Sequence, residues 1–130
     1  VKKIGSSVFS ACKLLSRIEF ADDSELQTIG NSVFNGCNLD YFAIPNNVVK
    51  LKPEWSLGMT TNKFKISCEC KNYKNFNNVF ILGKRDINIQ NFDVIVYCSC
   101  DVKTVFIPSF IKKISDYALL CMQEFKNCCL

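Results

Sequence analysis

The chain has 130 residues and a formal net charge of +4, with 48% hydrophobic and 22% charged residues. These values are ordinary for a folded domain and exclude a disordered polar chain. The basic residues are scattered singly or in pairs without interleaved aromatic side chains, which argues against nucleic-acid binding, and no apolar run of about eighteen residues indicates membrane insertion.

The chain repeats itself near its beginning. Residues 4–12 read Ile-Gly-Ser-Ser-Val-Phe-Ser-Ala-Cys, and residues 29–37 read Ile-Gly-Asn-Ser-Val-Phe-Asn-Gly-Cys. A third and more divergent copy closes the chain over 104–130. A unit of about 20 to 30 residues cannot bury its apolar face alone, so successive units are expected to stack around one continuous core.

Two periodicities alternate within each repeat. Inward and outward side chains alternate over 18–20 and 42–44, which predicts short strands, and the same pattern predicts strands over 64–66 and 105–107. Apolar residues over 6–15 recur at three-to-four spacing, which predicts a helical turn or two on the opposite side of each coil.

The string Ile-Gly-x-x-Val-Phe-x-x-Cys, followed by Leu and then Ile-x-Phe or Ile-Pro, resembles the BspA-like, or Treponema pallidum-type, leucine-rich repeat family of protist surface proteins. The resemblance implies an α/β leucine-rich repeat solenoid, with short parallel strands on the concave face and short helical turns opposite. The middle of the chain departs from the pattern, and its apolar runs over 79–82 and 94–97 predict a β-hairpin-like insertion.

We therefore predict a single leucine-rich repeat solenoid domain over 1–130. Its predicted parts are repeats over about 4–28 and 29–51, an atypical repeat with the insertion over 52–103, and a last repeat over 104–130. The chain lacks polar capping units at its ends, so we expect it to be a fragment of a longer protein.

Nine cysteines and no histidine raise the questions of metal and disulfide. The Cys-x-Cys pairs at 68–70 and 98–100 place one residue between thiols, where structural zinc sites usually place two or more, so no metal is expected. One repeated position is occupied by Cys12, Cys37 and either Cys121 or Met122, and the cysteines there are predicted to be buried free thiols. Disulfides between the two Cys-x-Cys pairs remain an open alternative.

The sequence offers no catalytic constellation. Histidine is absent, and so are a phosphate-binding glycine loop and a serine-elbow motif, so we predict neither enzymatic activity nor a cofactor. Asp22 and Asp23 follow a predicted strand, where adjacent carboxylates most often make turns. Trp55 aligns near the repeated Val-Phe position and is predicted to fill the core.

The predicted strands leave a row of outward side chains on the concave face, a surface suited to recognising another protein. Phe106 is the expected aromatic anchor of this row. The candidate protein-binding residues are Arg17, Glu19, Tyr41, Ala43, Lys63, Lys65, Thr104 and Phe106.

The family resemblance also implies a biological setting. Similar proteins lie on the surface of bacteria and parasitic protists, where they mediate adhesion to host cells or extracellular matrix and act as surface antigens. We therefore predict a cell-surface or extracellular protein-binding domain in a host–parasite interaction. The alternative is a cytoplasmic protein–protein interaction scaffold, which the odd number of cysteines favours.

Overall fold

The computed structural model describes residues 1–59, 61, 63–67, 69–99 and 102–119. Nine short strands lie within these ranges, and no helix does. The strands are β1 (Lys3–Ile4), β2 (Thr28–Ile29), β3 (Phe42–Ile44), β4 (Lys50–Leu51), β5 (Phe64–Ile66), β6 (Lys74–Phe76), β7 (Phe80–Gly83), β8 (Val94–Cys98) and β9 (Lys113–Ile114).

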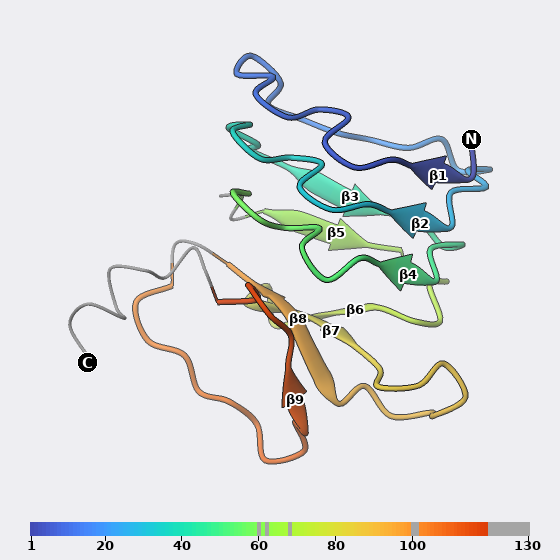
Figure 1. Cartoon of the computed structure of the whole chain (residues 1–130). Coiled ribbons are helices and arrows are strands. Elements are labelled where there is room, and N and C mark those ends of the chain that lie inside the picture. Colours follow the sequence, from blue (N-terminus) through green and yellow to red (C-terminus); the bar gives the residue numbers. More distant parts are fainter. Residues whose placement is uncertain (60, 62, 68, 100–101, 120–130) are drawn as a thin grey trace.

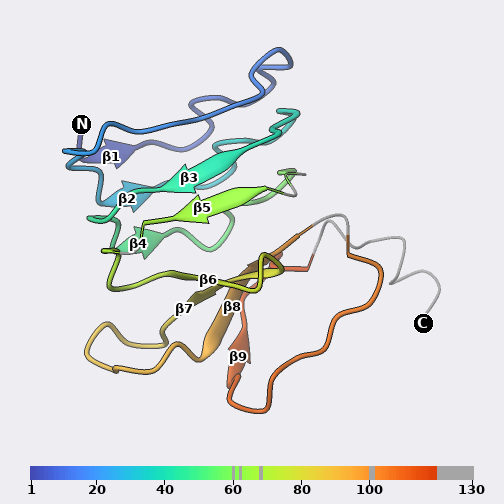
Figure 2. The same ribbon diagram turned by 180° about the vertical axis from the view of Figure 1, so that it is seen from behind.

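The first half of the chain is a stack of coils that pass through two parallel ladders. One ladder is the sheet β1-β2-β4, in which Ile4, Ile29 and Leu51 are in register. The other pairs β3 with β5 and is extended by an isolated parallel bridge between Arg17 and Tyr41. The first ladder faces the viewer in Figure 1, and the view from behind in Figure 2 brings the second to the front. Short parallel strands are therefore confirmed.

The predicted helical turns do not form in the described residues. Residues 6–15 make a series of turns, in which Ser7 and Ala11 have φ of 61° and 62°, and the same positions of the second coil, Ser32 and Gly36, have φ of 54° and 81°. A residue in the left-handed region stops a right-handed helix. The backbone donors reach the next coil instead: Ser7 N donates to Asn31 O at 3.0 Å, Phe9 N to Val33 O at 3.1 Å, and Ala11 N to Asn35 O at 2.7 Å.

Aromatic rings form the core of the stack. The ring of Phe34 is fully buried, lies parallel to the ring of Phe9 at a centroid distance of 6.1 Å, and meets Phe42 edge-on at 5.1 Å. Trp55 is 2% exposed and continues the series, with its ring 5.5 Å from Phe42 and 5.8 Å from Tyr97. Its predicted role as a core residue is confirmed.

Beyond β5 the chain changes to an antiparallel meander. The apolar runs 79–82 and 94–97 supply β7 and β8, which pair antiparallel, while β6 pairs antiparallel with β7 and β9 pairs parallel with β8. A second core cluster of Phe80, Leu82, Ile95, Cys98 and Ala118 lies against this sheet. Both strands are buried along most of their length, which explains their continuous apolar sequence. That this segment is an insertion within an atypical repeat stays a prediction.

The strand predicted over 105–107 does not form. These residues belong to a loop that runs alongside the meander before β9, at the opposite end of the molecule from β1 (Figures 1 and 2). β6 packs next to β5, and among the described strands no further parallel strand follows β5 in its ladder. The only parallel partner of β8 among the described strands is β9, at Lys113 and Ile114.

The repeated cysteine position behaves differently in the two coils. Cys37 is a buried free thiol whose S–H donates to the carbonyl oxygen of Phe9 at 2.9 Å, and burial raises the pKa of this thiol. Cys12 is also a free thiol but is exposed, because no coil covers this side of the first one in the structure. The prediction of burial is therefore right for Cys37 and wrong for Cys12, while Cys121 lies outside the described residues.

Candidate functional site

The ladder of β3 and β5 brings six of the predicted residues into two rows. The bridge between Arg17 and Tyr41, and the hydrogen bond from Phe42 N to Lys63 O, align Arg17, Tyr41 and Lys63 across the stack. Ala43 and Lys65 are register partners, and the same register places Glu19 beside Ala43. The two rows face outward because the intervening residues Ile18, Phe42 and Phe64 are buried.

Arg17 is the centre of a small cluster on this face. Its Nη2 lies 2.7 Å from Glu19 Oε1, and its guanidinium carbon lies 4.1 Å from the centroid of the Tyr41 ring. The hydrogen bond from Arg17, followed by its charge, lowers the pKa of Glu19. An ion pair this exposed adds little stability. Its effect is to hold a flat guanidinium over an aromatic ring, an arrangement that a partner protein can contact with little loss of side-chain entropy.

A groove of about 560 Å³ opens where these strands end. Tyr41, Ala43 and Lys65 of the two rows are among the residues that line it. The groove is lined by Glu19, Phe20, Ala21, Asp22, Tyr41, Ala43, Ile44, Pro45, Asn46, Lys65, Ser67 and Glu69. Asn46 Nδ2 donates to Glu69 Oε2 at 3.2 Å and ties two neighbouring coils together beside it.

Sequence reasoning missed part of this groove. Asn46 follows β3, Ser67 and Glu69 follow β5, and Asp22 follows the bridged residue Arg17 in the first coil, whereas the prediction used only the strand residues themselves. The repeat register was the available signal, since equivalent turns of a solenoid stack on one another.

Two predicted residues lie away from the ladder. Thr104 and Phe106 are exposed in the loop between β8 and β9, and Phe106 is 88% exposed. The exposure predicted for Phe106 is correct, but its placement on the concave sheet is wrong because the strand over 105–107 does not form.

The described residues show no metal-binding arrangement. No group of three or more potential cysteine, aspartate, glutamate or histidine ligands occurs among them. Cys68 and Cys100, one member of each Cys-x-Cys pair, lie outside the described ranges, while Cys70 is a buried free thiol. Within the same ranges, no helix is long and apolar enough to cross a membrane.

The stacked coils, their parallel ladders and the repeated left-handed turns define a leucine-rich repeat protein. More narrowly, the chain belongs to the BspA type leucine rich repeat family: the model of that region matches residues 1–130 in six copies. No curated protein matches the chain.

Two solved structures share this fold. A leucine-rich repeat protein from Eubacterium ventriosum matches with a TM-score of 0.74 and 27% identity, over 91% of this chain and 30% of that one. The pneumococcal vaccine antigen PcpA matches with a TM-score of 0.78 and 19% identity, over 91% of this chain and 28% of that one. The chain therefore spans less than a third of the length of either protein.

Proposed function

We propose that this domain is a non-enzymatic protein-binding module, and that it forms part of a cell-surface adhesin or immunogenic protein that contacts host cells or extracellular matrix. The observation that carries the proposal is the β3–β5 face, where Arg17, Tyr41 and Lys63 form one row and Glu19, Ala43 and Lys65 the next. Aromatic and arginine side chains with mixed charge around them are typical of protein interfaces.

The groove next to these rows supports the same function. It lies on an open strand face and carries charges of both signs from Glu19, Asp22, Lys65 and Glu69. Such a surface suits a loop or strand of another protein, which can place its own charged and apolar side chains across several coils. PcpA is described as a vaccine antigen, and we extend an antigenic role to this chain only as part of the proposal.

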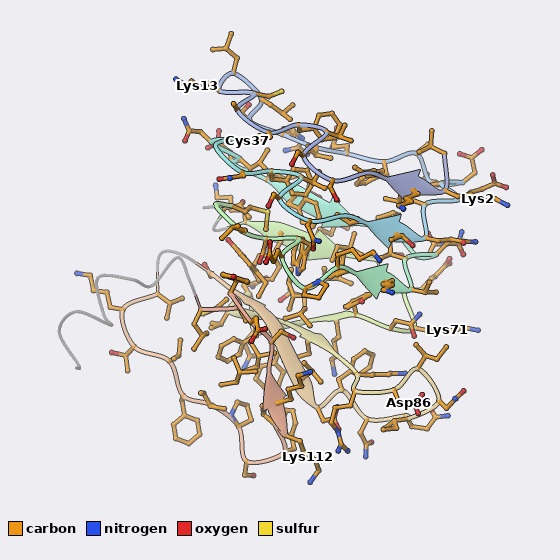
Figure 3. The ribbon with its side chains drawn as sticks, in the orientation of Figure 1. Lys2, Lys13, Cys37, Lys71, Asp86 and Lys112 are labelled. Carbon is orange, nitrogen blue, oxygen red and sulfur yellow. The ribbon has the colours of Figure 1, made fainter. Side chains whose placement is uncertain are left out.

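The test is adhesion of the purified domain to cultured epithelial cells and to plates coated with extracellular matrix. We expect Tyr41→Ala and Lys65→Glu each to weaken adhesion roughly tenfold or more, as losses at interface anchors do. The matched control for the charge change is Lys13→Glu, because Lys13 is exposed at the far turn of the first coil (Figure 3). Equal adhesion by all variants would refute the assignment of this face.

A cytoplasmic interaction scaffold is the second candidate. It is favoured by the free thiols of Cys37 and Cys70, both buried, which are typical of a reducing compartment. Antibody labelling of intact and permeabilised source cells separates the two candidates. Labelling of intact cells supports the adhesin, and labelling after permeabilisation alone supports the scaffold.

A further inference from the structure

The sheet β1-β2-β4 presents a second outward face, distinct from the β3–β5 face. Lys3, Thr28 and Lys50 are register partners, and they point outward because the following residues of the three strands, Ile4, Ile29 and Leu51, pack toward the core. Lys52 lies two positions after Lys50 and so shares its side of the strand. We call Lys3, Lys50 and Lys52 the basic face.

The positive charges of Lys3 and Lys50 act on the pKa of Lys52 within the basic face. The pKa of Lys52 is lowered, first by the charge of Lys50 and further by burial and by the charge of Lys3. In the described part of the chain the ion pairs are Arg17–Glu19 and Arg85–Asp93, neither of which includes a lysine of this face. The three lysines therefore share one face of the sheet, and none of them is ion-paired to a carboxylate among the described residues.

The arrangement is linear along the stack of coils. Neighbouring strands of a sheet lie about 4.8 Å apart, so Lys3 and Lys50, separated by β2, stand about 10 Å apart. Figure 3 shows Lys2 and Lys71 projecting from the same side of the molecule, at the first coil and just beyond β4. Lysine recurs at the equivalent position of β9, as Lys113 before Ile114. The β1-β2-β4 sheet thus carries a lysine on its first and last strands, with Thr28 between them.

We infer that the basic face binds a linear, sulfated polysaccharide that runs along the stack of coils. A chain with an anionic group every few ångströms can contact Lys3, Lys50 and Lys52 at once and displace the counterions that these charges hold. Segments 2–5, 27–30 and 49–52 contain no aromatic residue on which a nucleic-acid base could stack. Val49 is the one large apolar side chain exposed in these three segments, which is less than an interfacial membrane anchor uses.

This inference goes beyond the proposed function, because it concerns a different face and a different class of partner. The test is binding of the full 130-residue chain to immobilised heparin, used as the sulfated probe, across a range of NaCl concentrations. We expect the double variant Lys50→Gln/Lys52→Gln to bind roughly tenfold more weakly at 0.15 M salt. The slope of log K against log [NaCl] should fall in magnitude by about two, one for each lysine removed.

The control is Lys13→Gln/Lys103→Gln, which removes the same charge from exposed positions outside both faces. We expect it to bind heparin within about twofold of the unmodified chain. An equal loss in both double variants would show non-specific attraction to the net charge and would overturn the inference. Tighter binding to duplex DNA, or to phosphatidylserine vesicles, than to heparin at equal salt would also overturn it.

The protein-binding proposal for the β3–β5 face and the polysaccharide-binding proposal for the basic face can be refuted independently. Tyr41→Ala should weaken cell adhesion and leave heparin binding unchanged, because Tyr41 lies on the β3–β5 ladder. Loss of heparin binding in Tyr41→Ala would contradict the separation of the two faces. Adhesion retained by Lys50→Gln/Lys52→Gln, together with lost heparin binding, is the expected pattern when both proposals hold.

Discussion

Truncation of Phe34 tests the stacked core most directly. Its side chain has no exposed surface and contacts Phe9 of the preceding coil and Phe42 of its own coil. Phe34→Ala removes the buried ring, leaves a cavity between coils and loses two aromatic contacts that each contribute about 0.5–1.5 kcal/mol beyond burial. We expect the free energy of unfolding to fall by about 3–5 kcal/mol in total.

A loss of that size is a large part of the stability of a domain, which is typically about 5–15 kcal/mol. For 130 residues it corresponds to a decrease of roughly 10–20 °C in the unfolding midpoint. Urea titration followed by circular dichroism gives the free energy and the m-value together. A lower m-value would show that the first coil has unfolded separately, which a solenoid allows because each coil contacts only its neighbours.

The matched control is Phe106→Ala, which removes the same ring from a site that is 88% exposed. We expect its unfolding midpoint to lie within about 2 °C of the unmodified chain, since surface truncations change stability by about 0.5 kcal/mol or less. A loss below about 1 kcal/mol for Phe34→Ala, or an equal loss for both variants, would refute our account of the core.

Three further predictions use the coil contacts, the ion pair between Arg85 and Asp93, and a buried phenol. Gly30→Ala should lower stability by about 1–3 kcal/mol, because its Cβ would lie 2.8 Å from backbone atoms of the preceding coil. Gly5→Ala, whose Cβ would lie 3.8 Å from Val8 Cγ2, should be tolerated, and equal midpoints of the two variants in thermal melts would contradict this. Burial acts to raise the pKa of the Asp93 carboxyl, but the hydrogen bonds and the charge of Arg85 outweigh burial, so the pKa is lowered. The ion pair therefore stabilises the fold at neutral pH, and this stabilisation is lost as the pH falls below 3.8, the ordinary pKa of an aspartate. Arg85→Gln should therefore unfold at lower urea concentration than the unmodified chain at pH 7, with a smaller difference at pH 3, and a difference that grows on acidification would count against the pair. Burial raises the pKa of Tyr73 to about 12. The neutral phenol therefore contributes its full stabilisation below pH 10, the ordinary pKa of tyrosine, and loses it as the pH rises toward 12. Absorbance titration at high pH should show a late-ionising phenol that is absent from Tyr73→Phe.

Repetition in the sequence is sufficient to predict the class of fold and part of the candidate site. The two copies of Ile-Gly-x-x-Val-Phe-x-x-Cys predict stacked coils, and the structure pairs them in register at Ile4 and Ile29. Alternation over 42–44 and 64–66 predicts two strands correctly and places Ala43 beside Lys65. These features are local or periodic, so they are visible without knowledge of tertiary contacts.

The helical turns and the last predicted strand depend on neighbours that the sequence does not identify. Residues 6–15 have helical spacing, yet Ser7 and Ala11 adopt left-handed φ and their N–H groups bond to the next coil. The pattern over 105–107 is that of a strand, but these residues lie in the loop before β9. Over 6–15 the contact with the next coil outweighs the local preference, as tertiary contacts commonly do for weak propensities.

By itself, the sequence determined that this protein has a leucine-rich repeat fold with short parallel strands, because side-chain periodicity and repeat spacing are properties of the chain alone. Only the tertiary structure decided which repeated positions are buried, as the exposed Cys12 and the buried Cys37 show. It also decided that the turns after β3 and β5 form a groove, and that Lys3, Lys50 and Lys52 share one face. Both the burial of a repeated position and the faces that residues share depend on the contacts between adjacent coils, and these contacts form only when the coils stack.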